Sequence, residues 1–348
     1  MISANNFVPV NWASGVDQKT GRPIENPAAR WPGKQPFFQL PGPLGAHNWH
    51  PMSFSPATGL VYIPAQEIPF LYGELGPFTE KKGGWNTGAA FVLGALPTDE
   101  ATYKALRAML RGRLIAWDPV KQAPRWSVEH FGPWNGGVLS TAGGLVFQGA
   151  SDAHFAAYDA ATGERVWRFF TETGVVAAPI AFESDGETYV AVATGWGGAY
   201  ALIAGGVVPT GSEAKVGRVL TFKVGAKGAL PAAAPVETAA APPPPSTAAP
   251  DVIAAGAALY AQNCTVCHGE HAMSSGLVPN LRRSPLIADA ALWDEVVRKG
   301  ARAPLGMASF GGIFDEAGSE AIRAYVISEA NSARDATWYR AASKSGGR

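Results

Sequence analysis

The chain has 348 residues, of which 47% are hydrophobic and 16% charged, and its 28 Lys and Arg balance 28 Asp and Glu. This length allows two domains, and the absence of a basic excess gives no indication of nucleic-acid binding. Apolar runs fall short of the roughly 18–20 residues that a membrane-spanning helix needs. The 41 Gly and 28 Pro predict many turns between short strands.

The N-terminal residues 1–15 run directly into a segment rich in Gly, Pro and Trp. They contain no basic region followed by an apolar one, so no secretory signal is predicted. The segments 1–50 and 64–112 have a loop-rich composition without clear strand periodicity.

A repeat indicates β-propeller blades. Ala116, Trp117 and Asp118 are followed by Trp126, and 41 positions later Ala157, Tyr158 and Asp159 are followed by Trp167. A period of about 40–50 residues with short strands is typical of propellers; the alternative is a β-sandwich with coincidental spacing. Strands are expected at 60–63, 145–147 and 189–192. Asp118 and Asp159 are interpreted as turn residues, and Trp167 is expected to pack sideways on its neighbour.

An Ala/Pro-rich stretch divides the chain. Residues 225–250 include four consecutive prolines at 242–245 and have no periodic apolar face, which predicts an extended linker. The predicted domains are therefore a partial propeller over 1–224, with three or four blades, and a second domain over 251–348.

The second domain is predicted to be all-α. Helices are expected over about 252–262, with Asp251 as the N-cap, over about 289–299, and over 316–332, with Ile322, Tyr325 and Val326 on one face.

The motif that carries chemistry is Cys-x-x-Cys-His at residues 264–268. Two thiols three positions apart on one turn can reach both vinyl groups of a porphyrin edge, and the adjacent His268 can ligate the iron, so Cys264 and Cys267 predict covalent haem c. A thioredoxin-like pair would need a βαβ setting, and a zinc site would need two further ligands, of which only His271 is near.

The second axial ligand is expected to be Met307, in a Gly-containing loop before the last helix. Met273 is the competitor, but it follows His268 by only five residues, too few to reach the opposite haem face. Open coordination is the other alternative. A His/Met pair raises the haem potential relative to two histidines, which suits accepting electrons from an organic donor. Arg282 either pairs with a haem propionate or is solvated.

Propeller blades, an Ala/Pro linker and a Cys-x-x-Cys-His domain, in this order, resemble the quinohaemoprotein alcohol dehydrogenases over essentially the whole chain. The telling stretches are GAHNWHPM at 45–52, TGLVYIPA at 58–65, WNGGVLSTAGGLVF at 134–147 and GWGG at 195–198. Trp117 and Trp126 match the family's blade-docking pattern. The resemblance implies an eight-bladed propeller that binds PQQ and calcium, of which this chain carries the late blades.

By the same resemblance, Asn48 and Trp49 match an Asn-Trp pair that closes the quinone site; from sequence alone such a pair is more often structural. The turn at 173–179 is a weaker expectation for the central funnel. The remaining histidines show no metal-site spacing and are interpreted as loop or core residues; they are His47, His50, His130 and His154.

Several family features have no counterpart in this sequence: the catalytic Asp, the calcium-ligating Glu and Asn, the Trp platform and a vicinal disulfide. No catalytic residue is therefore assigned. The expected function is that of the C-terminal portion of such an enzyme, passing electrons from reduced quinone through haem c to an acceptor protein or quinone, with another polypeptide supplying the missing blades. The alternatives are a stand-alone c-type cytochrome with a degenerate propeller for docking, and a bare interaction scaffold. Haem attachment implies the periplasm.

Overall fold

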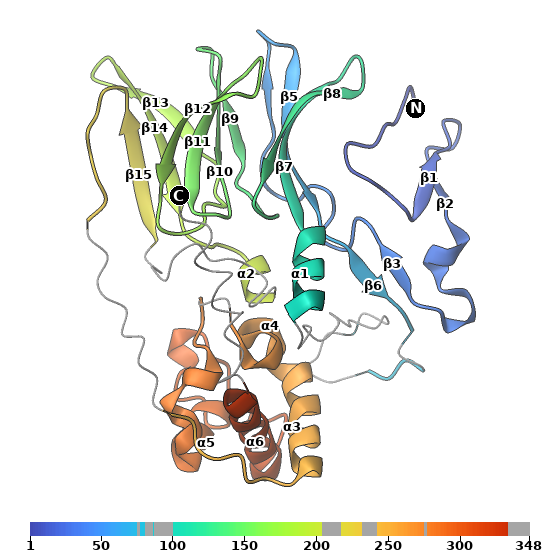
Figure 1. The fold of residues 1–348 in the computed structure, drawn as a ribbon, viewed down its shortest axis with the longest axis vertical. Coiled ribbons are helices and arrows are strands. Elements are labelled where there is room, and N and C mark those ends of the chain that lie inside the picture. The colour runs from blue at the N-terminus through green and yellow to red at the C-terminus, as the bar shows by residue number, and fades with distance from the viewer. Residues whose placement is uncertain are drawn as a thin grey trace.

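The computed structural model describes residues 1–74, 77–80, 86, 100–203, 217–231, 242–274 and 277–332. A sheet-rich part precedes a helical part, and the two lie against each other (Figure 1). The middle of the predicted linker and the end of the predicted second domain lie outside the described residues, so the domain boundaries stay predictions.

Three antiparallel sheets have the form of propeller blades and stand side by side in an open arc (Figure 1). Neighbouring strands within each sheet are antiparallel and follow one another along the chain, as in a meander, except that the second and third strands of the first sheet are separated by a strand of another sheet and by a helix. The first sheet has the order β4 (Ser53–Ser55), β5 (Leu60–Glu67), β7 (Arg111–Asp118) and β8 (Ala123–His130). The second comprises β9 (Val138–Ser140), β10 (Leu145–Gly149), β11 (His154–Asp159) and β12 (Arg165–Phe170). The third comprises β13 (Ile180–Ser184), β14 (Glu187–Thr194) and β15 (Arg218–Lys223).

The predicted loop-rich segments contribute only small elements to the described structure. Two-stranded sheets are formed by β1 (Ala13–Val16) with β2 (Pro23–Glu25) and by β3 (Phe37–Gln39) with β6 (Phe70–Tyr72). Short 3₁₀ turns span Pro27–Arg30 and Pro32–Lys34. Helix α1 (Glu100–Met109) leads into the first blade, and the one-turn helix α2 (Tyr200–Ile203) follows β14.

The 41-residue repeat marks equivalent positions in two successive blades. Asp118 ends β7 and its Oδ1 accepts hydrogen bonds from Val120 N and Lys121 N at 3.0 and 2.9 Å. Asp159 ends β11 and caps the next turn in the same way, through Ala161 N and Thr162 N. Both aspartates are therefore turn residues, as the sequence predicts.

Tryptophans at the repeat position join neighbouring blades. The Trp126 ring of the first blade lies over the turn of the second, where its Nε1 donates to Ala160 O at 3.1 Å. A Cβ atom on Gly163 would come within 2.7 Å of that ring, so the turn admits only glycine there. Trp167 repeats the arrangement in the next blade, with its ring centroid 5.1 Å from that of Phe222. These contacts confirm the predicted sideways packing and the propeller fold.

Apolar side chains between the sheets form the core of this arc. Tyr62, Leu114 and Val146 are essentially inaccessible between the first and second blades. Phe155 and Val175 are equally buried between the second and third. Burial of apolar area of this kind contributes about 25 cal/mol per Å² and holds adjacent blades in register.

The described residues of the helical part form four α-helices around one core. They are α3 (Pro250–Asn263), α4 (Thr265–His268), α5 (Ala290–Val297) and α6 (Glu316–Ser332), with 3₁₀ turns at Glu270–Ala272, Leu281–Arg283, Pro285–Ala288 and Ala303–Leu305 between them. The predicted cap of the first helix is wrong, because Ala249 is the N-cap and Asp251 lies inside the first turn. Pro250 is accepted as the first helical residue because that position needs no N–H donor.

Helices α3 and α6 cross in close contact at a glycine. A Cβ atom on Gly256 would coincide with the backbone carbonyl of Ala321, so only glycine allows this approach. Tyr260, Ile322 and Val326 fill the core beside the crossing. The predicted apolar face of the last helix is confirmed, with Tyr325 partly buried against the same cluster.

The two parts meet at one face of the blades. Helix α2, at the end of the third blade, contacts α4 of the helical part (Figure 1). The linker is also fastened to the helical part, because Asn331 Nδ2 donates to Pro244 O at 2.8 Å. Among the described helices none is both long enough and apolar enough to cross a bilayer.

Candidate haem site and the adjoining blade face

The Cys-x-x-Cys-His motif lies on a tight turn between α3 and Gly269. Cys264 N donates to Tyr260 O at 2.8 Å, which ends α3, and His268 N donates to Cys264 O at 2.9 Å, which closes the single turn of α4. Gly269 then leaves the helix with φ 74°, a backbone conformation that suits glycine. Both thiols and the imidazole are therefore carried by one turn.

His268 is held in the orientation that a metal-ligating histidine needs. Its Nδ1 lies 3.1 Å from Pro279 O, and the side chain is buried. Because a carbonyl oxygen only accepts, Nδ1 must carry the proton and Nε2 keeps its lone pair. Burial lowers the pKa of His268, an effect that the bond to Pro279 partly offsets, so the ring is kept neutral. A neutral imidazole with its second nitrogen fixed by a carbonyl is the usual form of an iron ligand.

The two cysteines lie in different environments. Cys264 is partly buried against the helical core, whereas Cys267 is exposed. Burial, with a smaller contribution from Cys267, raises the pKa of Cys264 to about 12, so this thiol is protonated at neutral pH. A thioether at this position would remove a buried titratable group from the core.

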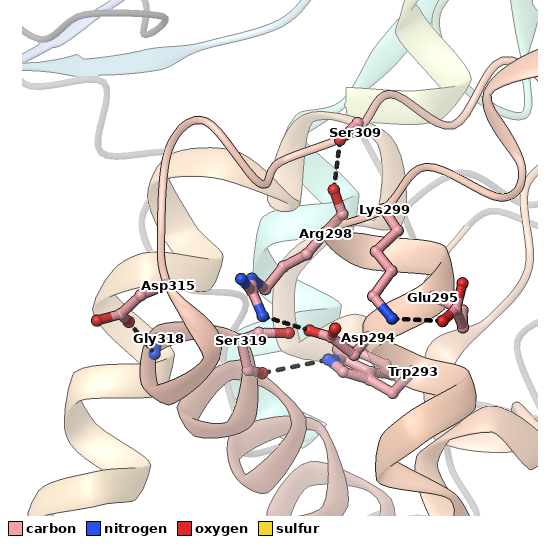
Figure 2. Close-up of polar contacts among 9 residues, drawn as sticks. All are labelled: Trp293, Asp294, Glu295, Arg298, Lys299, Ser309, Asp315, Gly318 and Ser319. Carbon is pink, nitrogen blue, oxygen red and sulfur yellow. Dashed lines mark hydrogen bonds and ion pairs between the residues drawn. The ribbon is translucent and has the colours of Figure 1, made fainter.

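Met307 lies in a loop that α5 fastens in place. Ser309 Oγ donates to Arg298 O at 2.5 Å, as Figure 2 shows, and Phe310 N donates to Val297 O at 2.9 Å. Gly311 must be glycine here, since a Cβ would approach Arg298 O to 2.7 Å. The loop is therefore attached by hydrogen bonds to the C-terminal end of α5.

The same region is tied to the last helix. Trp293 Nε1 of α5 donates to Ser319 O of α6 at 3.2 Å, and Asp315 Oδ1 accepts from Gly318 N at 2.9 Å at the start of that helix (Figure 2). The i,i+4 ion pairs of Asp294 with Arg298 and of Glu295 with Lys299 stabilise α5 on its outer side. These contacts fix the frame from which Met307 projects.

The structure brings Met307 and Cys264 together at one core. Both are partly buried and pack against the same apolar cluster, which includes Tyr260 and Trp293. Met273 is itself buried and follows Ala272, whose backbone is left-handed at φ 57°. Cys264 and Met307 pack against this cluster, His268 is buried on the adjoining turn, and Cys267 is exposed. Two thiols, a neutral imidazole and a thioether are the donor set that haem c would need for its covalent anchors and axial ligands.

The rival metal interpretation finds no support in the described part of the chain, where no group of three or more His, Cys, Asp or Glu could hold a metal ion. His271 instead pairs with Glu329, Nδ1 to Oε2, at 3.0 Å. Arg282 Nε donates to Asn280 Oδ1 at 3.3 Å, so this arginine belongs to the turn after Pro279.

Asn48 and Trp49 lie in the loop between β3 and β4, and ring contacts link Trp49 to Tyr200 of α2, the helix that contacts α4. Asn48 Nδ2 donates to Leu44 O at 3.0 Å, and its Oδ1 accepts from Trp49 N at 2.9 Å, which fixes the loop. The Trp49 side chain is 54% exposed, and its Cζ2 would lie 3.9 Å from a Cβ atom on Gly198. An accessible indole face on a fixed loop can stack on a planar heterocycle, so the pair fits a quinone contact.

The turn at residues 173–179 lies on the same face as Trp49's neighbour Gly198. Val175 forms a parallel bridge with Gly195, and Gly195 N donates to Gly174 O at 2.8 Å. Trp196 packs on Gly174, where a Cβ would approach the indole to 2.5 Å. Thr173 is buried, so the described structure gives this turn a packing role.

Two further residues contact this site. The sequence analysis interprets His50 only as a loop or core residue and includes Trp134 only in a family-like stretch. His50 is only 2% exposed, and its ring stacks on Trp49 with the centroids 4.1 Å apart. Trp134 is buried beside it, with a left-handed backbone at φ 64° that is rare for a bulky residue. In the sequence, His50 follows Trp49 and Trp134 precedes Asn135. These positions are 84 residues apart, and no sequence pattern links them, so the contact between the His50 and Trp134 rings could not be predicted.

Comparison with known proteins agrees with this division of the chain. A model of the glucose/ethanol/alcohol dehydrogenase β-propeller domain matches residues 116–190, and a model of the cbb3-type cytochrome c oxidase subunit III matches residues 251–326. The chain is 44% identical over 331 residues to quinohemoprotein alcohol dehydrogenase ADH IIB of Pseudomonas putida. It is 41% identical over 344 residues to the dehydrogenase subunit of an alcohol dehydrogenase (quinone) of Komagataeibacter europaeus.

Solved structures show the same similarity. Quinohemoprotein alcohol dehydrogenase ADHIIG of Pseudomonas putida HK5 superimposes with a TM-score of 0.89 at 36% identity, covering 97% of this chain and 50% of that one. The enzyme of Comamonas testosteroni gives 0.77 at 40% identity, covering 95% and 47%. The sequence relatives are matched over 94% and 95% of this chain but over only 46% and 45% of their own length. The chain thus spans about half the length of its relatives.

Proposed function

We propose that this chain, which is homologous to quinohaemoprotein alcohol dehydrogenases over 94% of its length or more, acts as the C-terminal portion of such an enzyme. In this role it passes electrons from a reduced quinone cofactor through covalently bound haem c to an external acceptor, either a protein or a quinone. Cys264 and Cys267 would anchor the haem, and His268 and Met307 would ligate its iron.

The observation that carries the proposal is the fixed orientation of His268. Its Nδ1 is committed to Pro279 O, and the adjacent thiols lie on the same one-turn helix. When bound, a haem iron with imidazole and thioether ligands supplies a one-electron carrier of raised potential. The chain's part is to hold the ligands, exclude water with the cluster around Tyr260 and set the distance to the donor.

On the quinone side, Asn48 and Trp49 would contact PQQ. The residues that would hold calcium and abstract the alcohol proton belong to the part of the relatives that this sequence does not match. Because haem c is attached to reduced thiols outside the cytoplasm, we place the chain in the periplasm. Relatives such as ADH IIB of Pseudomonas putida are named alcohol dehydrogenases, so we propose an alcohol as the ultimate electron source.

The test is to export the chain to the periplasm of a host that attaches haem c, and to measure its mass and its reduced-minus-oxidised spectrum. We expect one haem per chain and a c-type band. Cys264→Ala with Cys267→Ala should abolish covalent attachment, and Arg282→Gln should retain it as a matched change in the same domain. A wild-type chain with two free thiols and no c-type band would refute the proposal.

A stand-alone c-type cytochrome with a degenerate propeller is the second candidate. It is favoured by the fact that every proposed haem ligand lies within this chain, while the family's catalytic Asp and calcium ligands have no counterpart in it. The DNA upstream of Met1 separates the two. A reading frame that encodes the earlier blades supports a split enzyme, and a secretory signal directly upstream supports the cytochrome.

A further inference from the structure

Four aromatic rings on the blade face are in contact in one row. The ring centroids are 4.1 Å apart from Trp49 to His50, 5.0 Å from His50 to Trp134, and 4.7 Å from Trp134 to Tyr200. We call these four residues the aromatic stack. It begins at an exposed ring and continues through side chains that are all more than nine-tenths buried.

The far end of the stack leads to the haem motif. Tyr200 is the first residue of α2, and α2 contacts α4, the helix that carries Cys267 and His268 (Figure 1). The stack therefore leads from Trp49, one of the two residues expected at the quinone, to α2, and α2 contacts the helix expected at the haem.

Trp134 is held in the stack at a cost. Its backbone is left-handed at φ 64°, a conformation that strains a bulky residue. Trp134 N donates to Gln66 Oε1 at 3.3 Å, and Gln66 Nε2 donates to Leu44 O at 3.1 Å, so one side chain links Trp134 to the loop before Trp49. The stacked Tyr200 ring, at an interplanar angle of 16°, holds it from the other side. Strain of this kind is retained where the placement of a side chain matters to function.

The stack also carries no fixed charge at neutral pH. Burial, with a smaller contribution from His47, lowers the pKa of His50 to about 4, so its imidazole is neutral. Tyr200 is a phenol whose pKa is raised by burial. A neutral row of rings in contact couples donor and acceptor electronically better than a gap or a solvated path, because tunnelling decays more steeply through empty space than through packed atoms.

We propose that the aromatic stack of Trp49, His50, Trp134 and Tyr200 is the route by which electrons pass from the quinone side to the haem. This inference rests on the proposed function and assigns new residues to it. For each electron, the donor beside Trp49 is oxidised by one equivalent and one ferric haem becomes ferrous. A reduced quinone therefore needs two successive transfers, with its two protons released to solvent.

A photochemical measurement tests the route on the full haem-loaded chain. With Cys264 and Cys267 consumed by haem, Met52→Cys leaves one free thiol three residues after Trp49, at a side chain that is 48% exposed. A ruthenium bipyridyl label attached there gives one electron to the ferric haem after a light pulse, forming Ru(III) and ferrous haem. The rate of haem reduction follows from the absorbance change.

We expect Trp134→Leu to slow this transfer several-fold and Trp134→Phe to retain most of the rate. Trp196→Leu is the matched control, because Trp196 lies in the same buried cluster but is outside the stack. A second label site is Val120→Cys, in the turn between β7 and β8. We expect electron transfer from this label to be slower and to be unchanged by Trp134→Leu.

Two results would overturn the route: an unchanged rate in Trp134→Leu with normal haem spectrum and potential, or an equal loss in Trp196→Leu. Failure of the proposed function is distinguishable from either. It would appear as the absence of a c-type band in the unlabelled parent chain, before any transfer rate is measured.

Discussion

Met307 and Met273 are the two methionines considered as the second axial ligand, and they have different surroundings. Met307 lies in a loop fastened to α5 and packs against the apolar cluster that Cys264 also contacts, whereas Met273 is buried just past the motif. We expect Met307→Leu to lower the haem potential and to remove the sulfur-to-iron absorption band, because a thioether favours ferrous iron. Redox titration and near-infrared absorption measure the two effects.

Met273→Leu is the control for that substitution. It changes a buried thioether to an alkyl group of similar volume, which costs less than about 1.5 kcal/mol in well-packed cores, and it should leave the band and the potential in place. Loss of the band in Met273→Leu with retention in Met307→Leu would reverse the assignment of the two methionines.

His50 makes the blade part sensitive to acid. Its folded pKa is about 4 against an ordinary value of 6.5, so between these pH values the unfolded chain binds a proton that the folded chain does not. The free energy of unfolding therefore falls as the pH drops through this window, by up to about 3 kcal/mol from this residue.

Denaturant titrations at pH 4.5 and 7 of the wild type and His50→Phe check this sign. His50→Phe keeps an aromatic ring between Trp49 and Trp134 but cannot bind a proton. We expect a smaller loss of stability on acidification in the variant. An equal loss in both proteins would show that His50 is not buried as a neutral ring.

At the scale of the elements, the join between blades depends on a turn that only glycine fits. Gly163 has φ 77° and lies under Trp126, while Gly186 has φ 78° with open space around it. Gly186→Ala should cost about 1–2 kcal/mol from the left-handed backbone alone. Gly163→Ala should cost about 1–3 kcal/mol more, because its methyl group overpacks the indole.

The free energy of unfolding from denaturant titration gives both values, and fluorescence of the tryptophans reports the displaced ring. Equal costs at the two glycines would mean that Trp126 moves away freely and that the blade join is loose. The difference between the two variants removes the backbone contribution and isolates the packing of one blade on the next.

At the scale of the whole molecule, the described blades form an open arc, and the chain matches only part of its relatives. The chain covers about half of their length, and no catalytic Asp or calcium ligand is assigned in it. We expect the purified haem-loaded chain with added PQQ and calcium to show no alcohol oxidation. An artificial electron donor of low potential should still reduce its haem.

Alcohol-dependent reduction of a dye is the measurement, and turnover by the chain alone would contradict the prediction. Co-expression with a polypeptide that carries the earlier blades should restore turnover if the chain is one part of a split enzyme. The haem band serves as the control in both experiments, because it shows that the electron-carrying part is folded.

Short-range patterns determined much of this protein. The repeat around Asp118 and Asp159 predicts hairpins because an Asp side chain caps its own turn locally, and the spacing of Trp126 and Trp167 follows from one blade docking on the next. The arrangement of residues 264–268 depends on a single helical turn, so the chemistry of this motif can be predicted without knowledge of the tertiary structure. The predicted cap at Asp251 was wrong because the helix begins two residues earlier, at Pro250, with Ala249 as its N-cap. Local propensity does not decide between these two starting points.

Only the tertiary structure decided which of these features meet. His50, Trp134 and Tyr200 come from three separate segments, and no periodicity connects residues whose contact depends on how successive blades end at one face. The contact of α2 with α4 likewise joins residues on opposite sides of the linker. Sequence fixes local geometry because neighbouring atoms are bonded, whereas contacts between distant segments depend on the packing of the whole chain.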